Sequence, residues 1–320
     1  MYKRQDKTEL FITEDGLNSS AAKLVEIGDL LLALYGATSG DIAISKIKGA
    51  INQAILCIRT KQNKKFIESV WNKHVERLLQ TYLQGGQGNL SADIVKNIPF
   101  YFADLEEQDK LANFISLLDE RISTQNKIIE DLKLLKSAIS LNVLHSDTWE
   151  QFKIKDIAQI GRGRVISSIE ISQQKSPTYP VYSSQTSNDG IMGYLDDYMF
   201  EGEYISWTTD GANAGTVFYR NGKFNCTNVC GLLKLIKGFD THFVSLVLAE
   251  ATKKYVSINL ANPKLMNNTM GNIQIRLPKL EEQKRISIVF RVLQRLWTIH
   301  NSLLTEYIKQ KQYLLSQMFI

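Results

Sequence analysis

The stretch Gly161-Arg162-Gly163-Arg164 has side chains that could bind a charged ligand. Its two guanidinium groups could each donate hydrogen bonds to phosphate oxygens. An exposed turn would have the same sequence, and the residues alone support the two interpretations equally.

Other chemically capable residues do not form a recognisable active site. Gly85-Gly86-Gln87-Gly88 lacks the Gly-Lys-Ser/Thr of a phosphate-binding loop, so we interpret it as a flexible loop. Cys226 and Cys230 have no second Cys/His pair at ligand spacing, and the four histidines form no cluster. A purine-binding methyltransferase needs an Asn/Asp-Pro-Pro-aromatic tetrapeptide, which Asn262-Pro263-Lys264-Leu265 is not. We therefore expect no enzyme activity, no metal and no bound cofactor.

Composition narrows the class of protein without defining its function. The 320 residues are 44% hydrophobic, which favours a folded chain of two domains or one large one. Three cysteines cannot form a disulfide framework, so we predict a cytoplasmic protein. The sequence has no secretory signal and no apolar run near the roughly 18 residues of a membrane span. The net charge of +5 is compatible with nucleic-acid binding but does not indicate it.

An internal repeat organises the chain. Leu105-Glu106-Glu107-Gln108 recurs as Leu280-Glu281-Glu282-Gln283, an offset of 175 residues (280 − 105). The same offset relates further identical residues: Asn97-Ile98 to Asn272-Ile273, Gly36 to Gly211, and Gly40 to Gly215. A period this long is far beyond that of a solenoid, so it indicates a duplicated domain followed each time by a long helix.

Each long helix carries a seam of positions spaced alternately by four and three residues, as in a coiled coil. The assigned seam positions are Leu111, Ile115, Leu118, Ile122, Gln125, Ile129 and Leu132 in the first helix, and Ile286, Phe290, Leu293, Trp297, His300, Leu304 and Tyr307 in the second. The polar members Gln125 and His300 are themselves 175 residues apart (300 − 125). We predict that the two seams pack on each other, with two independent surface helices as the alternative.

The segments before the helices have strand-like apolar runs. Strands are predicted at 27–34, 42–47, 51–58, 204–208, 216–219 and 229–236, with Asn221-Gly222 as a hairpin turn and helices near 64–83 and 241–256. The predicted fold class is α+β, with two mixed α/β domains alternating with two long helices that pair as an antiparallel coiled coil. The expected bounds are 1–104 and 146–279 for the domains and 105–145 and 280–320 for the helices.

Several motifs resemble a known family. They are residues 12–21 (ITEDGLNSSA), residues 30–40 (LLLALYGATSG) followed by Asn52-Gln53-Ala54, Asn97-Ile98-Pro99 before the repeated helix, and Trp149-Glu150 with Lys155-Asp156-Ile157-Ala158 and Gly161 in the second copy. They are similar to target-recognition domains of type I restriction–modification specificity subunits. The resemblance covers nearly the whole chain, and the order domain–helix–domain–helix is its most specific feature.

The resemblance implies a non-catalytic subunit that reads a bipartite double-stranded DNA target, one half with each domain. It also implies that the paired helices hold the domains apart, fix the unread spacer, and dock two methyltransferase subunits, which restriction/translocase subunits then join. S-adenosylmethionine and ATP would be bound only by those partner subunits, and no membrane would be involved.

In such domains, polar loop side chains enter the major groove, where they can address base edges. The candidates in the first copy are Tyr35, Thr38, Ser39, Asn52, Gln53, Gln84 and Gln87. Those in the second copy are Ser183, Ser184, Gln185, Thr208, Thr209, Asp210, Asn213, Asn225 and Asn228, with Arg162 and Arg164 for phosphates or guanines. Turn geometry is the alternative explanation for the repeated glycines, and turn capping for Asn52 and Asn228.

The two copies differ at their beginnings. At the common offset, Trp149 corresponds to position −26 (149 − 175), so the first domain is expected to lack its opening strands and to recognise its half-site weakly or after complementation. This keeps an alternative function open: a fragment that assembles with or titrates methyltransferase subunits without directing methylation. An enzyme with an unrecognised active site is the least favoured alternative.

Overall fold

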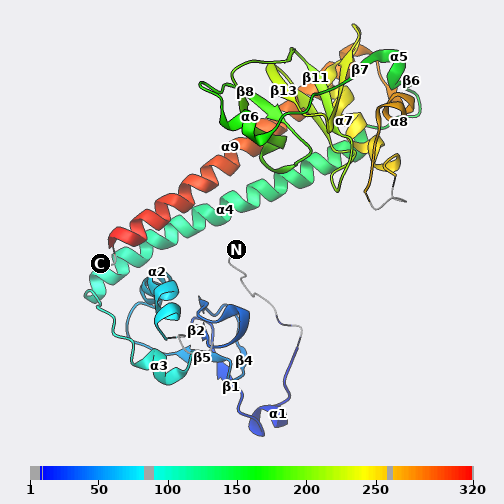
Figure 1. The fold of residues 1–320 in the computed structure, drawn as a ribbon. Coiled ribbons are helices and arrows are strands. Elements are labelled where there is room, and N and C mark those ends of the chain that lie inside the picture. Colours follow the sequence, from blue (N-terminus) through cyan, green and yellow to red (C-terminus); the bar gives the residue numbers. More distant parts are fainter. Residues whose placement is uncertain (1–7, 9, 83–89, 258–261, 319–320) are drawn as a thin grey trace. The chain divides into compact units, whose positions relative to one another are not determined.

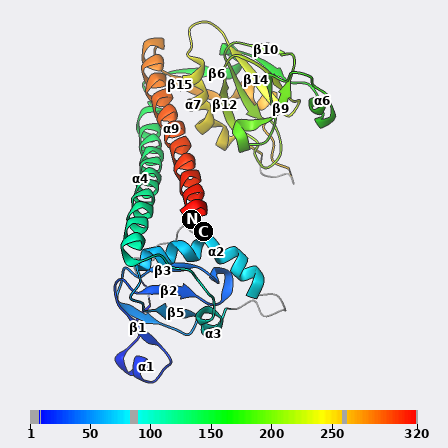
Figure 2. The ribbon, with the colours of Figure 1, turned by 90° about the vertical axis from the view of Figure 1, so that its left-hand side faces the viewer.

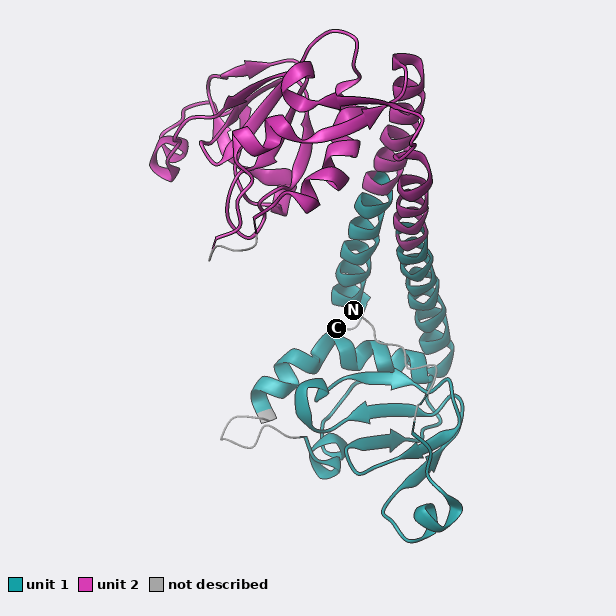
Figure 3. Ribbon diagram, turned by 90° about the vertical axis from the view of Figure 1, so that its right-hand side faces the viewer, with its two compact units in different colours: residues 1–129, 299–320 teal, residues 130–298 magenta. Residues whose placement is uncertain are grey.

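The computed structural model describes residue 8 and residues 10–82, 90–257 and 262–318 (Figure 1). The chain divides into two compact units, the first within residues 1–129 and 299–320 and the second within residues 130–298 (Figure 3). The division runs through both long helices. Each unit therefore contains one mixed domain together with a part of each helix.

Unit 1 is built on a three-stranded antiparallel sheet of order β3-β2-β5. Its elements before the long helix are α1 (Glu14–Asn18), β1 (Lys23–Val25), β2 (Leu30–Ala33), η1 (Gly36–Thr38), β3 (Ile42–Ile44), β4 (Gly49–Ile51), β5 (Ile55–Ile58), α2 (Lys64–Tyr82) and α3 (Ala92–Lys96). Helix α2 lies across the sheet (Figure 2), and Trp71 on it shares a core with the fully buried Leu30 and Leu32. The Trp71 indole N–H donates to the Gly40 carbonyl at 2.7 Å, which fixes the helix against the β2–β3 loop.

Unit 2 has a larger domain with two four-stranded sheets, of order β12-β11-β14-β7 and β10-β13-β8-β9, and a two-stranded sheet, β15-β6. Its elements are β6 (Glu150–Lys153), α5 (Ile154–Ile157), β7 (Ala158–Arg162), α6 (Ser168–Ser172), β8 (Tyr179–Tyr182), η2 (Ser187–Gly190), β9 (Ile191–Leu195), β10 (Phe200–Glu201), β11 (Tyr204–Thr208), β12 (Val217–Arg220), β13 (Lys223–Cys226), β14 (Cys230–Leu235), α7 (Thr241–Ala251), η3 (Thr252–Lys254), α8 (Asn267–Asn272) and β15 (Gln274–Leu277).

The hairpin predicted at Asn221-Gly222 is wrong. The two residues do form a turn, with Gly222 at φ +98°. However, β12 before the turn pairs with β11, whereas β13 after it pairs with β10 and β8, so the flanking strands belong to different sheets. The turn signal was correct, but the pairing partners come from distant parts of the chain.

The two long helices, α4 (Leu105–Val143) and α9 (Leu280–Met318), each begin at the leucine of the repeated motif. The motif's glutamine explains why it recurs. Gln108 is buried, donates to the Ala103 carbonyl at 2.8 Å and accepts from the Asn63 backbone N–H at 3.0 Å. Gln283 likewise donates to the Pro278 carbonyl and accepts from the Asp240 backbone N–H. In each copy this side chain therefore ties the start of the long helix to the domain that precedes it.

The internal repeat is confirmed at the level of elements. Adding 175 to the bounds of β2, β3, β5, α2 and α3 leads to β11, β12, β14, α7 with η3, and α8, within a few residues. The strands and helices predicted at these places are confirmed. The second sheet of unit 2, by contrast, was not predicted.

Candidate nucleic-acid interface

One end of the central sheet in unit 2 gathers most of the polar candidates. Strand β11 ends at Thr208 opposite Cys230, the first residue of β14, and β7 ends at Arg162 opposite Gly231. The end of β7, the loop 209–216 and the turn 227–229 therefore lie at the same end of the sheet.

The Gly161–Arg164 stretch combines both interpretations that its sequence allowed. A Cβ on Gly163 would come within 2.1 Å of the Cys226 carbonyl oxygen, so close backbone packing requires glycine there. Arg164 is bound to Glu170, and this hydrogen bond holds the pKa of the Glu170 carboxyl below its usual range. The Arg162 side chain is exposed, and its guanidinium makes no ion pair or hydrogen bond to the residues that the structure describes. It is therefore the arginine of this stretch whose charge is available to an anion.

The segment that follows β8 stands beside the loop 209–216. The Asn213 side-chain amide donates to the Ser184 carbonyl at 3.1 Å, and the Gln185 side-chain amide donates to the Ile191 carbonyl. Ser183, Ser184 and Gln185 are half-buried. The structure thus brings these three candidates to the same sheet end as Asn213.

Three candidates of the second copy are corrected by their burial. Thr208, Thr209 and Asn225 are at most 2% exposed, so their side chains have no surface to offer to a base. The Thr209 hydroxyl donates to the Val229 carbonyl, and Asn225 bonds the Asp197 carbonyl and the Met199 N–H. Thr209 and Asn225 therefore hold the backbone of neighbouring segments in place. Asn228 is exposed, and Asp210 is half-buried with its backbone bridged to Lys264.

The equivalent end of the sheet in unit 1 carries the first copy's candidates. Strand β2 ends at Ala33 opposite Ile55, and the Leu34 N–H donates to the Ala54 carbonyl at 2.8 Å, so the loop 34–41 and the turn 52–54 are adjacent. In this loop and turn Tyr35, Thr38, Asn52 and Gln53 are exposed, while the Ser39 hydroxyl is used internally, donating to the Leu34 carbonyl. Asn52 also accepts from the Ala54 N–H at 3.0 Å, as a turn cap does. Gln84, Gln87 and the rest of the stretch 85–88 lie outside the described residues.

The repeated glycines give the two loops the same backbone conformation. Gly36 and Gly211 have φ of +78° and +87°, and Gly40 and Gly215 have φ of +88° and +82°, values that side chains disfavour. A Cβ on Gly40 would also meet Val75 at 2.8 Å, and one on Gly215 would meet Val256 at 2.5 Å. The loop that leaves the central strand is therefore built alike in both units.

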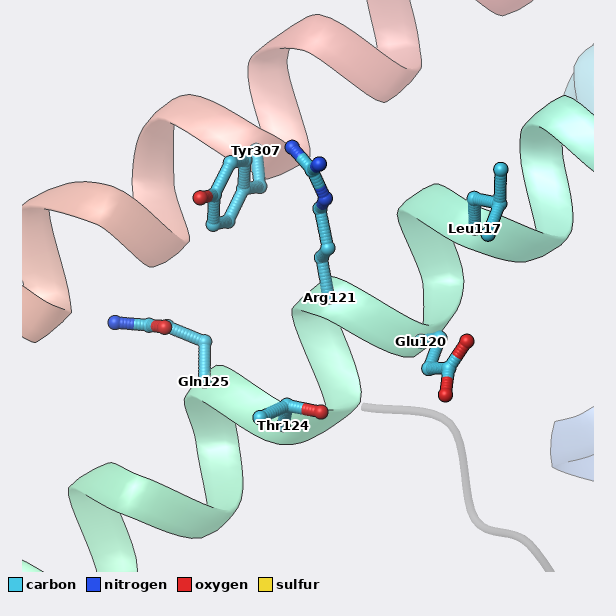
Figure 4. A pocket seen from close by; sticks show the side chains of 6 residues that line it. All are labelled: Leu117, Glu120, Arg121, Thr124, Gln125 and Tyr307. Carbon is cyan, nitrogen blue, oxygen red and sulfur yellow. The ribbon is translucent and has the colours of Figure 1, made fainter.

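The helix seams are buried within each unit. All the assigned seam residues are buried or half-buried. In unit 1 the Gln125 amide contacts His300 Nδ1 at 2.5 Å and donates to its carbonyl at 3.2 Å. Beside this pair a surface hollow of about 360 Å³ is lined by both helices, with Arg121 over the Tyr307 ring (Figure 4). In unit 2 the Lys136 ammonium donates to the Gln294 amide oxygen at 3.2 Å.

A charged cluster fixes the helix pair to α2 in unit 1. Asp119 accepts from Lys311 at 2.5 Å and from Lys65 at 2.7 Å. Burial alone would raise the pKa of Asp119, but the hydrogen bonds from the two ammonium groups outweigh burial and lower its pKa. This ion-paired cluster therefore links both long helices to α2 within unit 1.

Within the described ranges, no group of three or more His, Cys, Asp and Glu side chains could hold a metal ion, and Cys226 and Cys230 are buried free thiols. No helix in the part of the chain that the structure describes is long and apolar enough to cross a membrane.

Comparisons with known proteins agree on one family. The family model for the type I restriction modification DNA specificity domain matches residues 1–134 and 146–310. A putative type I specificity subunit of Mycoplasma pneumoniae is 36% identical over 202 residues, which cover 62% of this chain and 84% of that protein.

Two solved structures share the fold. The crystal structure of a type I restriction–modification S subunit from M. genitalium matches with a TM-score of 0.72 at 16% identity, covering 93% of this chain and 84% of that one. A structure from work on complex assembly and conformational transition of the type I restriction–modification system matches with a TM-score of 0.55 at 15% identity, covering 94% and 84%.

Proposed function

The chain belongs to the family of type I restriction–modification DNA specificity domains, and we propose that each of its units reads one half of a bipartite double-stranded DNA target. The observation that carries this proposal is the repetition of one surface. In both units an exposed polar loop and turn stand at the same end of the central strand, related by the 175-residue offset. Two similar reading surfaces of different sequence suit a target with two different halves.

Each surface holds the side-chain types that DNA recognition needs. In unit 2, Arg162 can neutralise a phosphate, while Asn228 and the segment 183–185 offer amide and hydroxyl groups to base edges. In unit 1, Tyr35, Thr38 and Gln53 take the corresponding places. Gln53 and Asn228 are one repeat apart (228 − 53 = 175), which makes them a matched pair for mutation.

The chain's role in this proposal is binding, and the chemistry belongs to partner subunits. Methyltransferase subunits would carry S-adenosylmethionine, and restriction/translocase subunits would carry ATP. Exposed apolar residues along the long helices, such as Leu117 (59% exposed) and Val292 (52%), support docking of a protein partner there. Action on host and invading DNA would place the complex in the cytoplasm.

The test is to express the full chain with the methyltransferase subunit of the same system and to map methylated bases in the host genome. We expect a new bipartite motif. Gln53→Ala should relax base preference in one half of that motif and Asn228→Ala in the other, each by about 1–3 kcal/mol of discrimination at the affected base pair. Asn221→Ala is the control, because this exposed residue follows β12 at the other end of the sheet.

The outcomes separate the candidate functions. A methylated bipartite motif that responds to the two variants in different halves supports the proposal. A stable complex with the methyltransferase subunit without any methylated motif would instead favour a fragment that titrates methyltransferase subunits. Variants that alter neither half would remove the loop surfaces from the DNA interface.

A further inference from the structure

Arg220, the last residue of β12 in unit 2, is a buried cation that the proposed DNA contacts do not use. Its side chain is 2% exposed and packs against two aromatic rings, with Cζ 3.6 Å from the centroid of the Tyr182 ring and 4.3 Å from that of Phe218. Burial lowers the pKa of Arg220, and an arginine still remains charged at neutral pH. A buried charge is retained only when specific partners compensate its desolvation, so the partners indicate its role.

The partners of Arg220 connect the central sheet to the segment 183–190. Its Nε donates to the Ser206 hydroxyl on β11 at 3.0 Å. Its Nη1 donates to the Asp189 carbonyl at 2.9 Å and to the Asp189 carboxylate at 3.3 Å. Asp189 itself is on the surface, with 74% of its side chain exposed. The buried guanidinium therefore holds the exposed residue Asp189 and the segment around it against the sheet.

The segment that Arg220 holds has an unusual backbone. Asn188 and Asp189 both have positive φ, +48° and +53°, and Gly190 follows at +82°. Residues with side chains rarely adopt this conformation, and two in succession persist only where the surroundings enforce it. A Cβ on Gly190 would also come within 3.0 Å of Arg220 Nη2, so the chain passes directly over the guanidinium.

The same segment carries polar candidates for reading DNA. Its two ends are joined by the Ser183 N–H donating to the Gly190 carbonyl at 2.9 Å. Between them lie Ser184 and Gln185, with Asn213 bracing the Ser184 carbonyl from the neighbouring loop. The segment 183–190 is thus held on two sides, by Asn213 and by Arg220.

We propose that Arg220 is a positioning residue for target recognition: it locks the segment 183–190 in the conformation that reads the half-site of unit 2. This inference rests on the proposed function and adds a specificity-determining residue that does not touch DNA. A positioning role predicts a loss of base discrimination in one half-site, without the loss of salt dependence that removing a phosphate contact would cause.

The experiment measures binding of the full chain, in complex with its methyltransferase subunit, to duplexes that carry the mapped motif or a mismatch in either half. Arg220→Met keeps an unbranched side chain of similar length without charge. We expect about a tenfold loss of discrimination in the unit 2 half-site, with discrimination in the other half and the salt slope unchanged. Arg220→Lys, which retains the charge but not the planar fork, should lose less.

Two further variants keep the test decisive. Asn188→Gly in the Arg220→Met chain should recover part of the lost discrimination, because glycine adopts positive φ readily. Asp189→Ala removes the carboxylate that Arg220 contacts and places alanine at a positive φ, so it loosens the same segment even if Arg220→Met unfolds. We expect it to lower discrimination in the unit 2 half-site about threefold.

Three results would overturn the inference. The first is a uniform loss of affinity with a smaller salt slope, which would make Arg220 a phosphate contact. The second is an Asp189→Ala chain that only binds DNA more tightly, as expected from removing a repulsive charge. The third is a set of folded variants with unchanged base discrimination. A wild-type complex that methylates no motif would reject the proposed function itself, so the two failures are distinguishable.

Discussion

At the scale of single residues, three arginines of unit 2 illustrate how environment decides what a guanidinium can do. Arg162 is exposed without an ion-pair partner in the described ranges, Arg164 is bound to Glu170, and Arg220 is buried under the segment 183–190. Each has the same charge and the same donors. Only the first combines an exposed position at the sheet end with an uncompensated charge.

This difference predicts distinct salt dependences for two variants. Arg162→Ala should weaken DNA binding across sequences and reduce the slope of log affinity against log salt by about 1, because one phosphate contact is lost. Arg164→Ala should change the slope less, since Glu170 already neutralises its charge. Fluorescence anisotropy titrations over a range of salt concentrations measure both slopes. Equal reductions for the two variants would show that Arg164 exchanges Glu170 for a phosphate.

At the scale of elements, the long helices were predictable and the second sheet of unit 2 was not. A seam that repeats every 3.5 residues is a local signal, and Ile115 and Phe290, both 1% exposed, sit where that spacing places them. Strand β10 has two residues, and β8 pairs in parallel with β13 across more than 40 positions, so nothing local identifies their partners.

The candidate site was predictable only in part, for the same reason. The loops could be located from the repeated glycines and the polar residues beside them. Whether a side chain faces solvent depends on the sheet that covers it, so the sequence places Thr208 and Asn225 at the surface although both are buried. Arg220 was missed because its role depends on Asp189, 31 positions earlier, although the Asn188-Asp189-Gly190 sequence is a recognisable signal for a turn with positive φ.

The contact between α7 and α9 within unit 2 predicts a pH dependence of stability. His242 Nδ1 lies 2.9 Å from the Ser287 hydroxyl, and its ring packs against that of Tyr219 at 5.1 Å. Burial lowers the pKa of His242 to about 4, with the charges of Arg291 and Lys136 acting in the same direction and those of Asp240 and Glu203 opposing. The unfolded chain binds a proton near pH 6.5, so stability from this group is complete above that pH and is lost as the pH falls towards 4.

The corresponding experiment is urea unfolding at pH 7.5 and pH 4.5. Wild type should lose up to about 3 kcal/mol of unfolding free energy through this group on acidification. His242→Gln should show a smaller loss, whereas His145→Gln, at an exposed position, should follow wild type. An identical pH response in His242→Gln and wild type would assign the acid sensitivity to other groups.

At the scale of the whole molecule, the repeat extends to the outward faces of the helices. Phe114 and Leu117 on α4 are 41% and 59% exposed, and the residues one repeat later on α9, Val289 and Val292, are 45% and 52% exposed. Large apolar side chains in such positions weaken solubility and are typical of surfaces that a partner covers. The chain thus carries one such apolar pair in unit 1 and an equivalent pair in unit 2.

Duplicated apolar pairs predict that one chain binds two copies of the same methyltransferase subunit. Leu117→Asp should remove one copy, Val292→Asp the other, and the double variant both, because each places a charge in the centre of an apolar contact. Light scattering of the purified complexes measures the stoichiometry, and Ser116→Asp, at an exposed polar position on α4, is the control.

Since both substituted residues are exposed, the variants should keep the stability of wild type. Complexes that retain two copies in the double variant would place docking on another surface, and a stoichiometry of one in wild type would show that only one of the two pairs is a docking site.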